Sequence, residues 1–464
     1  MAQLLFSAAH KSSGKTTITL GICAALARSG TVVQPFKKGP DYIDPMWLGR
    51  AAARPCYNLD FHTMSHEELR TLFTSRSTDA DISLIEGNMG LFDSLDIEGS
   101  MSNAALANLL DTPVVLVLDV KGATRSIVPL ILGFQQFDPE MKLGGIILNK
   151  VAGSRHEQRL REVIAHYCDI PILGAVHRDE RLSIDERHLG LIPSNEASAV
   201  DAKLNQVADI IEKQVDLKAL RELATSSSLP QVDISAKEPA TTPDLRIAYA
   251  RDAAFGFYYP DDLEALQQAG AELIPFDTLH DKSLPEEIDG LFIGGGFPET
   301  HMAALEANRS LHKAIRAAIE ADLPCYAECG GLMYLSRTVS WGENYHDMVG
   351  IIPGDCIMHE KPVGRGYARI RETGAMPWPG SELTVEQHAH EFHYSSLENL
   401  PSDLIFAYTM SRGVGINQQH DGFVYRNLLA NYVHLRSVSG NRWTERFIQF
   451  VRNCRDKPIA TAIQ

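Results

Sequence analysis

The chain has 464 residues, of which 44% are hydrophobic and 22% are charged, so it can bury two cores of ordinary domain size. Its formal net charge of -16 at pH 7 repels nucleic acid and anionic membranes, which excludes both as main partners. Any anionic substrate must therefore meet a local cluster of basic side chains.

The seven cysteines are odd in number and include no Cys-x-x-Cys pair, which disfavours a disulfide framework and a zinc cage. The N-terminus shows no basic stretch before a long apolar core and no signal-type cleavage site. No apolar run approaches the ~20 residues that a membrane helix needs. We therefore expect a soluble cytoplasmic protein without a membrane partner.

Short apolar runs rich in β-branched residues recur through the first half and alternate with helical stretches. Such runs are typical of buried strands in a mostly parallel sheet with helices on both faces. The pattern predicts a doubly wound α/β domain over residues 1–222, with strands at residues 4–6, 32–33, 82–85, 114–118, 145–148 and 172–176.

A phosphate-loop pattern occupies residues 9–16, between the first predicted strand and a predicted helix at residues 17–26. Gly14 lets the backbone turn its amides toward a phosphate, Lys15 can reach the terminal phosphates, and the Thr16 hydroxyl can hold Mg²⁺. Ala9 replaces the usual first glycine, so an ordinary Gly-Lys-Thr turn is the alternative. The flanking strand and helix favour an ATP site formed by Ser12, Ser13, Gly14, Lys15, Thr16 and Thr17.

A Mg²⁺-ATP site also needs carboxylates beyond the loop. Asp41, Asp44 and Glu86 lie in Gly- and Pro-punctuated segments after predicted strands. The carboxyl ends of parallel strands form the edge where ligands bind, so we expect these acids to gather there. Taken singly, each acid could instead be a solvated loop residue or a helix cap. The predicted Mg²⁺ ligands are Thr16, Asp41 and Glu86.

Small and polar residues dominate residues 223–243, which predicts an interdomain linker. Further apolar runs follow at residues 245–249, 273–274, 291–293 and 325–327. These runs predict a second α/β domain over residues 244–464.

Cys329 follows an apolar strand and precedes two glycines and a helix. A tight strand-to-helix turn of this kind exposes a thiol beside helix amides, which we expect to lower its pKa. His434, near the end of the domain, is the candidate base, although a lone histidine is more often structural. Cys325 lies inside the strand and is expected to be a core residue.

A glycine turn at residues 294–299 follows the strand at residues 291–293. Backbone amides in such a turn can stabilise the oxyanion of a tetrahedral intermediate. A plain glycine turn is the alternative. The candidate oxyanion residues are Gly295, Gly296 and Gly330.

Several longer strings together resemble the cobyrinate a,c-diamide synthase family, at residues 36–45, 58–60, 86–93, 327–331 and 390–395. The resemblance covers nearly the whole chain. It implies a dethiobiotin-synthetase-like ATP domain fused to a class I glutamine amidotransferase domain of the cobyric acid synthase type. Members of this family amidate the a and c acetate side chains of a tetrapyrrole with ATP, Mg²⁺ and glutamine.

For the second domain, the resemblance implies that Cys329 is the glutaminase nucleophile and that His434 raises its nucleophilicity. Ordinary class I domains have a Glu two positions after this histidine. Arg436 stands there in this chain, as is usual for the branch that works without that Glu.

For the first domain, the resemblance implies that Lys15, Thr16 and Glu86 serve the nucleotide and Mg²⁺. The expected reaction is phosphorylation of an acetate to an acyl phosphate, which ammonia from the Cys329 site then attacks. The acceptor carboxylate and the acyl phosphate are expected at Asp41, Tyr42, Asp44 and Asp93.

The sequence leaves the identity of the macrocycle undecided. Corrinoid-acting members usually have a His after the Asp-Pro pair, whereas this chain has Met46-Trp47-Leu48. Related enzymes amidate sirohaem or nickel-sirohydrochlorin, and hydrogenobyrinate is a further candidate. Trp47 could stack on a macrocycle or fill the core. The candidate cations for the substrate carboxylates, each equally an ordinary surface residue, are Lys37, Lys38, Arg54 and Arg125.

A different class of function is a P-loop regulatory or partitioning ATPase with a non-catalytic amidotransferase domain. Such a protein has no use for a cysteine elbow paired with a C-terminal histidine, and this chain has both. The sequence therefore favours the enzyme. It leaves open a homodimer, the order of the two amidations, and the choice between ATP and GTP.

Overall fold

The computed structural model describes residues 2–184, 186–187, 190–195, 199–225 and 242–456. The chain divides into two compact units, Met1–Ser235 and Ala236–Gln464. Most of the predicted linker, residues 223–243, lies outside the described residues. Helix α8 (Leu217–Ala224) extends into its first positions.

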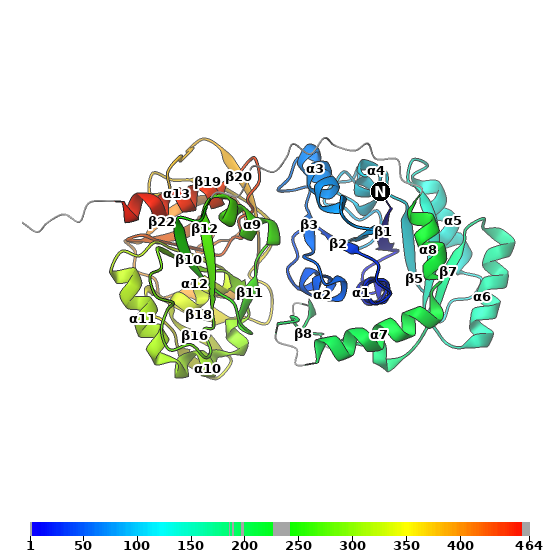
Figure 1. The fold of residues 1–464 in the computed structure, drawn as a ribbon, viewed down its shortest axis with the longest axis horizontal. Helices are drawn as coiled ribbons and strands as arrows, with labels where there is room; N and C mark the ends of the chain where they lie inside the picture. The colour runs from blue at the N-terminus through cyan, green and yellow to red at the C-terminus, as the bar shows by residue number, and fades with distance from the viewer. Residues whose placement is uncertain (1, 185, 188–189, 196–198, 226–241, 457–464) are drawn as a thin grey trace, which may run out of the picture. The chain divides into compact units, whose positions relative to one another are not determined.

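A parallel sheet forms the centre of the first unit (Figure 1), with the strand order β3-β2-β4-β1-β5-β6-β7. Every neighbouring pair in it is parallel. A short hairpin of β8 (Glu186–Arg187) and β9 (Gly190–Leu191) lies outside this sheet. The strands of the sheet are β1 (Gln3–Ala8), β2 (Val33–Lys38), β3 (Tyr57–Leu59), β4 (Ile82–Glu86), β5 (Val114–Asp119), β6 (Leu143–Val151) and β7 (Ile172–His177).

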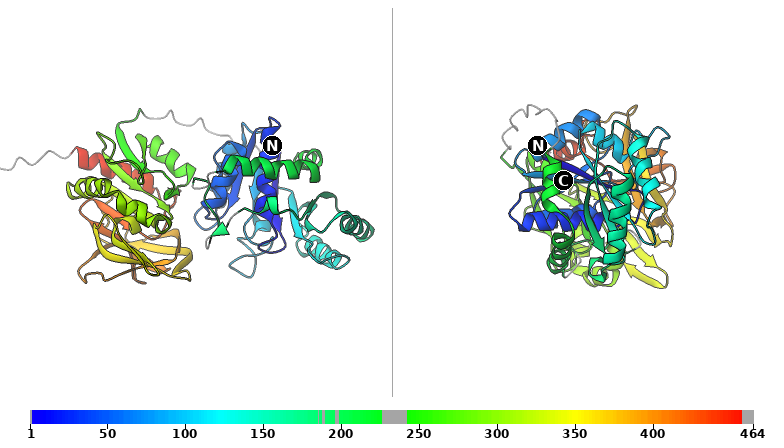
Figure 2. Two further views of the ribbon diagram at one scale, coloured as in Figure 1. Left: turned by 90° about the horizontal axis from the view of Figure 1, so that it is seen from below. Right: turned by 90° about the vertical axis from the view of Figure 1, so that its right-hand side faces the viewer.

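Helices cover both faces of this sheet, as two further views also show (Figure 2). On one face α1 (Lys15–Arg28), α2 (Ile43–Ala52) and α7 (Val200–Gln214) pack against one another. The fold is thus the predicted doubly wound α/β domain. The remaining helices of this unit are α3 (His66–Ser77), α4 (Asn103–Leu109), α5 (Ile127–Phe137), α6 (Ser154–Tyr167), α8 and a 3-10 turn at Glu180–Leu182.

The observed strands overlap all the predicted ones in this unit and add β3, β8 and β9. Strand β3 is only three residues long, and Asn58 interrupts its apolar pattern. Strand β2 continues beyond the predicted apolar pair at residues 32–33 as far as Lys38, and its two lysines are buried. Charged residues at a strand end conceal the strand from a search for apolar runs.

The second unit contains a larger mixed sheet with the order β12-β10-β13-β15-β24-β23-β22-β19-β20. Its first five strands are parallel to their neighbours, and the pairs from β24 to β20 are antiparallel. The strands are β10 (Leu245–Ala250), β12 (Ala271–Phe276), β13 (Gly290–Ile293), β15 (Cys325–Glu328), β19 (Gly364–Glu372), β20 (Glu386–His393), β22 (Ile405–Arg412), β23 (His420–Tyr425) and β24 (Leu428–Asn431).

Smaller sheets and helices complete this unit. One sheet has the order β17-β16-β18-β21, from β16 (Ser336–Trp341), β17 (Asn344–Asp347), β18 (Ile352–Met358) and β21 (Ser395–Glu398), and β11 (Phe255–Phe257) pairs with β14 (Gly295–Gly296). The helices are α9 (Pro260–Gln268), α10 (Met302–Ala307), α11 (Arg309–Glu320), α12 (Gly330–Leu335), α13 (Trp443–Arg455) and a 3-10 turn at Pro298–Thr300.

Trp443 anchors helix α13 to the larger sheet. Its ring centroid lies 5.5 Å from that of Phe292 on β13 and 5.0 Å from that of Tyr326 on β15. Its indole N–H donates to the buried carboxylate of Asp262 at 3.2 Å. The contact joins apolar burial with a satisfied buried polar group, so it holds the last helix against the strands that position the second site.

We predict that Trp443→Ala lowers the free energy of unfolding of the second unit by about 3–5 kcal/mol, because it leaves a large cavity. Trp443→Phe keeps most of the ring and loses the hydrogen bond, so its cost is about 1–2 kcal/mol. Urea denaturation followed by circular dichroism measures both changes. Equal unfolding midpoints for Trp443→Ala and the wild type would contradict this account of the core.

Candidate active sites

The predicted phosphate loop connects β1 to α1. Gly14 has φ 82°, and a Cβ on it would lie 2.2 Å from the side-chain nitrogen of Asn149. That nitrogen donates to the Ser13 carbonyl at 2.8 Å, and the Ser13 hydroxyl donates to the His10 carbonyl at 2.8 Å. Only glycine fits here without strain, and Asn149 holds the loop in its bend.

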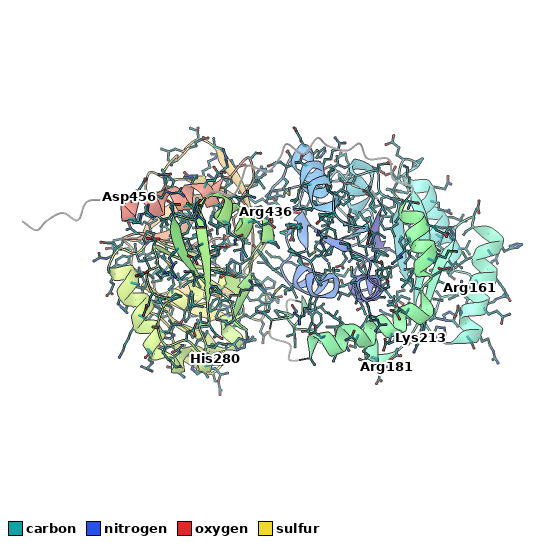
Figure 3. All side chains as sticks on the ribbon, in the orientation of Figure 1. Arg161, Arg181, Lys213, His280, Arg436 and Asp456 are labelled. Carbon is teal, nitrogen blue, oxygen red and sulfur yellow. The ribbon has the colours of Figure 1, made fainter. Side chains whose placement is uncertain are left out.

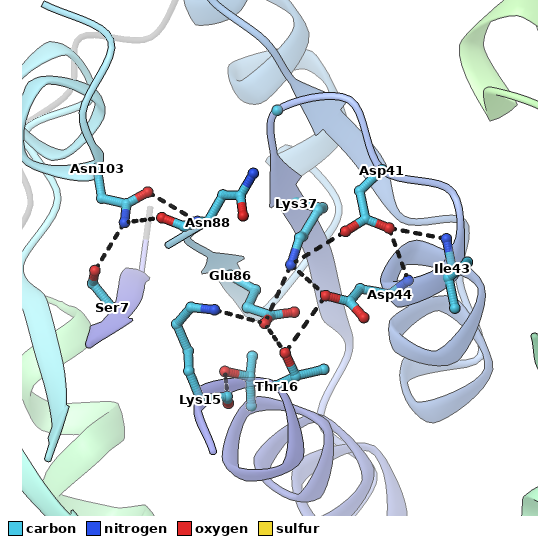
Figure 4. Close-up of polar contacts among 12 residues, drawn as sticks. Ser7, Lys15, Thr16, Lys37, Asp41, Ile43, Asp44, Glu86, Asn88 and Asn103 are labelled. Carbon is cyan, nitrogen blue, oxygen red and sulfur yellow. Dashed lines mark hydrogen bonds and ion pairs between the residues drawn. The ribbon is translucent and has the colours of Figure 1, made fainter. Parts of the chain in front are cut away.

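Carboxylates and ammonium groups meet beside this loop (Figure 4). Lys15 Nζ lies 3.2 Å from Glu86 Oε1, and the Thr16 hydroxyl donates to the same oxygen at 2.5 Å. Lys37 Nζ lies 2.5 Å from Asp44 Oδ2, 3.3 Å from Glu86 Oε1 and 3.6 Å from Asp41 Oδ2. The ends of β2 and β4 and the starts of α1 and α2 therefore bring the predicted residues to one place.

The pKa values in this cluster follow from burial and from the neighbouring charges. Burial by itself lowers the pKa of Lys37, but Asp44, Glu86 and Asp41 outweigh burial and raise it well above its usual value. Burial raises the pKa of Asp44, and the neighbouring Asp41 adds to this rise. Lys37 is thus a fixed cation that holds the carboxylates together.

The acids are held differently by their local structure. Asp41 accepts from the backbone N–H groups of Ile43 and Asp44 at 2.9 and 3.1 Å, so it fixes the start of α2. Asp44 lies in the first turn of that helix rather than in a loop. Tyr42 is buried at the N-cap position of the same helix. The Asp-Tyr-Ile-Asp string is therefore a helix start that presents two carboxylates.

Asn103 at the start of α4 fixes the loop that follows Glu86 (Figure 4). Its amide nitrogen donates to the Ser7 hydroxyl at 2.9 Å and to the Asn88 carbonyl at 2.7 Å, and its oxygen accepts from the Asn88 N–H at 3.0 Å. Asp93 accepts from the Gly90 N–H at 2.8 Å within the same loop. Asn103 could not be predicted as a site residue, because a single asparagine in a helical stretch carries no recognisable motif.

The donor set suits Mg²⁺. Of the predicted ligands, Thr16 and Glu86 lie together, whereas Asp41 caps the start of α2 and Asp44 lies beside the Thr16 hydroxyl in its place. The Thr16 hydroxyl and the carboxylates of Glu86 and Asp44 offer the oxygen ligands that this ion prefers. Glu86 is fully buried, and its Oε2 has no hydrogen-bond partner within the described structure. Among the described residues, no group of three His, Cys, Asp or Glu side chains is arranged to hold a metal ion. The residues therefore fit an ion that also takes ligands from phosphate and water.

Cys329 occupies the turn between β15 and α12, with the unusual backbone angles φ 46° and ψ -99°. Its N–H donates to the Asn431 carbonyl at 2.7 Å, and its carbonyl accepts from the Met333 N–H at 3.0 Å. A strained turn held on both sides is typical of nucleophile elbows. Cys325 is fully buried in β15, as its predicted core role requires.

The expected lowering of the Cys329 pKa is wrong in this structure. Burial raises the pKa of the thiol, and the carboxylates of Glu299 and Glu328 add to the rise. The Gly330 N–H lowers it only in part. Helix α12 is a single short helix of six residues, so its dipole does not offset burial. The thiol is therefore protonated at rest and needs a base.

His434 lies just beyond β24, the strand that pairs with β15. Its ring stacks on that of His390, with centroids 4.9 Å apart. Its backbone N–H donates to the His390 carbonyl at 2.7 Å. Asp421 accepts from the N–H groups of Tyr432 and Val433, which fixes the segment that leads to His434. Strand pairing thus brings the predicted thiol and base to one edge of the sheet.

The candidate oxyanion glycines lie against these two residues. A Cβ on Gly295 would lie 2.8 Å from His434 Cε1, and a Cβ on Gly330 would lie 2.9 Å from the backbone nitrogen of Gly296. A Cβ on Gly331 would lie 2.1 Å from the Ile293 carbonyl oxygen. The glycines therefore allow the β13–β14 turn to approach the elbow closely.

Arg436, labelled in Figure 3, is buried and does not lie at an open surface. It pairs with Asp261 at 2.6 Å, and its guanidinium lies 4.3 Å from the ring centroid of Tyr259. A guanidinium cannot replace the carboxylate that would support a histidine, so this position does not supply that function.

Comparison with known proteins covers both units. Residues 6–192 match the CobQ/CobB/MinD/ParA nucleotide binding domain, and residues 246–441 match the CobB/CobQ-like glutamine amidotransferase domain. A cobyrinate a,c-diamide synthase of Magnetococcus marinus is 46% identical over 97% of this chain and 97% of its own. Proteins of the same name from Methanosarcina barkeri and Listeria innocua are 37% and 38% identical, over 98% and 94% of this chain and 97% and 96% of their own.

The chain belongs to the cobyrinate a,c-diamide synthase family. The resemblance seen in the sequence is thus confirmed, and so is the class of a glutamine-dependent amide-forming ligase. The first unit carries the nucleotide-binding domain of the family. A regulatory ATPase with a non-catalytic second domain does not fit relatives that match across both units.

The structure of this family member shows the surroundings of the four candidate cations for the substrate carboxylates. Lys37 and Lys38 are buried rather than on the surface. Arg54 donates to Gln34 and Asp79, whereas Arg125 donates to the Tyr167 hydroxyl at 3.0 Å.

Trp47 is 2% exposed and donates its indole N–H to the Ile192 carbonyl at 2.8 Å. It fills the core of the first unit. This position does not support the alternative that Trp47 stacks on a macrocycle.

None of the seven cysteines, all of which lie within the described residues, forms a disulfide bond. Among the described helices, none is long and apolar enough to cross a membrane.

Lys38 gives a pH-dependent prediction. Burial lowers its pKa from 10.5 to about 8, with Asp60 opposing and Lys37 adding to the shift. Between these pH values the unfolded chain binds more protons than the folded chain, so stability rises with pH. Below pH 8 Lys38 is charged in both the folded and the unfolded chain, so it no longer makes the free energy of unfolding depend on pH.

The free energy of unfolding of the wild type minus that of Lys38→Met should therefore rise by on the order of 1–3 kcal/mol between pH 8 and pH 10.5. Urea denaturation of the two proteins at several pH values measures this difference. Stability curves that stay parallel across the range would show that Lys38 does not lose its proton on folding.

Proposed function

We propose that this chain amidates the a and c acetate carboxylates of cobyrinate, with ATP and glutamine, in cobalamin biosynthesis. The observation that carries the proposal is the presence of two sets of predicted site residues in one chain. One set surrounds the phosphate loop, and the other surrounds Cys329. Relatives named cobyrinate a,c-diamide synthase match both parts over nearly their full lengths.

The first site activates the acceptor. A carboxylate is a poor electrophile and hydroxide is a poor leaving group, so the oxygen must first become part of an acyl phosphate. Lys15 and the loop amides hold the terminal phosphates, while Thr16, Glu86 and Asp44 would hold Mg²⁺. The ion, when bound, neutralises charge on the transferred phosphoryl group. The acceptor lies beside Asp41, Tyr42 and Asp93.

The second site supplies ammonia. His434 takes the proton of the Cys329 thiol, and the sulfur attacks the side-chain amide carbon of glutamine. The amides of Gly295, Gly296 and Gly330 stabilise the oxyanion of the tetrahedral intermediate. Its collapse releases ammonia and leaves a thioester, which water hydrolyses to glutamate. The ammonia then attacks the acyl phosphate, forms the amide and releases phosphate.

Substrates of this enzyme are small molecules: a tetrapyrrole, glutamine and ATP. We place the reaction in the cytoplasm, in keeping with seven cysteines that form no disulfide bond within the described structure and with the use of ATP. The chain uses no nucleic-acid or membrane partner in this proposal. Sedimentation velocity decides between a monomer and a homodimer.

Mass spectrometry tests which macrocycle is the acceptor. Parallel reactions contain ATP, Mg²⁺, glutamine and one acceptor each. Cobyrinate should undergo two successive carboxyl-to-amide conversions. Conversion of sirohaem or nickel-sirohydrochlorin alone would reassign the acceptor and leave the chemistry unchanged. Failure of every acceptor would refute the amidoligase.

Cys329→Ser should abolish glutamine-dependent amidation and retain amidation with free ammonia, because the first site stays intact. The assay compares both nitrogen sources at saturating ATP. Cys325→Ala is the matched control, since that thiol is buried four residues earlier, in the strand that leads to Cys329. It should keep both activities. Loss of both activities in folded Cys329→Ser would refute two separate sites.

A further inference from the structure

The second site needs a group that orients the His434 ring. The Cys329 thiol is buried and must give up its proton, so the accepting nitrogen of the ring must carry none. A carboxylate on the other ring nitrogen normally ensures this arrangement. Arg436 stands where ordinary class I domains place that carboxylate, and it faces Asp261 instead.

Glu328 lies where such a carboxylate is needed. It is the last residue of β15 and directly precedes Cys329. Its Oε2 lies 3.5 Å from His434 Nδ1, and the two side chains are 5% and 3% exposed. Its Oε1 accepts from the Tyr326 hydroxyl at 2.5 Å and from the Leu435 N–H at 3.0 Å. Two donors therefore fix one oxygen and aim the other at the histidine.

We propose that Glu328 is the positioning residue of the glutaminase site, which holds the proton of His434 on Nδ1 and leaves Nε2 to take the thiol proton. The carboxylate comes from the residue before the nucleophile rather than from two positions after the histidine. This inference rests on the proposed glutaminase activity of Cys329.

The Leu435 hydrogen bond ties this arrangement to the backbone. Because Leu435 directly follows His434, its N–H places the histidine relative to the same carboxylate that faces the ring. On the other side, Glu328 is paired in register with Asn431 of β24, the strand that leads to His434. Strand pairing therefore fixes the carboxylate and the histidine together.

Other charged and titratable groups near the His434 ring are few among the described residues. The His390 ring on β20 stacks on it, and the Tyr259 hydroxyl lies 3.4 Å from His390 Nδ1. Arg436 and Asp261 form their own pair beyond Tyr259. The Cys329 thiol lies beside Glu299 as well as Glu328. Of these groups, Glu328 alone has a carboxylate at ion-pair distance from His434 in the described structure.

Glu328→Gln tests the proposal with little change in shape. The donors Tyr326 and Leu435 fix the carbonyl oxygen of the new amide, so its NH₂ group faces His434 Nδ1. That donor favours the tautomer with its proton on Nε2, which cannot accept from the thiol. We expect kcat for glutamine hydrolysis to fall about 10²–10⁴-fold, with KM for glutamine and ammonia-dependent amidation unchanged.

The split between kcat and KM separates this role from a structural one. The wrong tautomer slows the chemical step and leaves glutamine binding intact, so kcat should fall while KM for glutamine stays unchanged. Glu391→Gln is the matched control, because Glu391 is also buried, lies 3.5 Å from His393 Nε2 and accepts backbone N–H groups. This control should show no such selective loss of kcat.

Glu328→Asp keeps the charge but moves the carboxylate away from His434 by the length of one methylene. This variant tests the proposal if Glu328→Gln fails to fold. We expect an intermediate loss of kcat, about 10–100-fold, for this variant. A kcat for glutamine hydrolysis within about threefold of the wild type in either folded variant would overturn the proposal. The wild type and Cys329→Ser are measured alongside. If the wild type releases no ammonia from glutamine, the proposed function itself fails.

Discussion

The first site depends on one buried ammonium group. Lys37 lies at the end of β2 and contacts carboxylates from the start of α2 and the end of β4. Without it, three acids would be forced together at low dielectric, where like charges repel strongly. With it, the acids can stand beside Thr16 and Lys15 before any ligand arrives. The sheet order matters for the same reason, because it places β2, β4 and β1 side by side.

In the second unit, strand pairing rather than charge brings the site residues together. The elbow after β15 and the histidine after β24 belong to distant parts of the sequence, and the pairing of Glu328 with Asn431 brings them together. The hydrogen bond from the Cys329 N–H to the Asn431 carbonyl closes the arrangement. Both units therefore place chemistry at the carboxyl ends of neighbouring parallel strands, where backbone groups are free of the sheet.

Much of the fold could be read from the sequence, because buried parallel strands leave uninterrupted apolar runs such as residues 114–118. The loop at Gly14 and the elbow at Cys329 were also visible, since each needs particular residues at fixed spacing. The short strand β3 and the antiparallel strands of the second unit were not, because polar residues on one face break their apolar runs.

The site residues that escaped prediction share a physical cause. Lys37 was expected either to meet a substrate carboxylate or to be a surface cation, because burial of a lysine follows from its partners and not from its neighbours in sequence. The pKa of Cys329 was expected to fall, yet burial outweighed the amides of a short helix. Glu328 carried no signal of its own, since its partner lies more than a hundred residues away.

Asn149 has one more consequence, for the cost of nucleotide binding. Its amide holds the Ser13 carbonyl, so a contact within the protein, and not phosphate alone, fixes the bend of the phosphate loop. A flexible loop would lose conformational entropy on closing around its ligand, at about 1–2 kcal/mol for each residue that becomes ordered. A loop that is ordered in advance avoids this loss. More of the intrinsic attraction between amides and phosphate then remains as affinity.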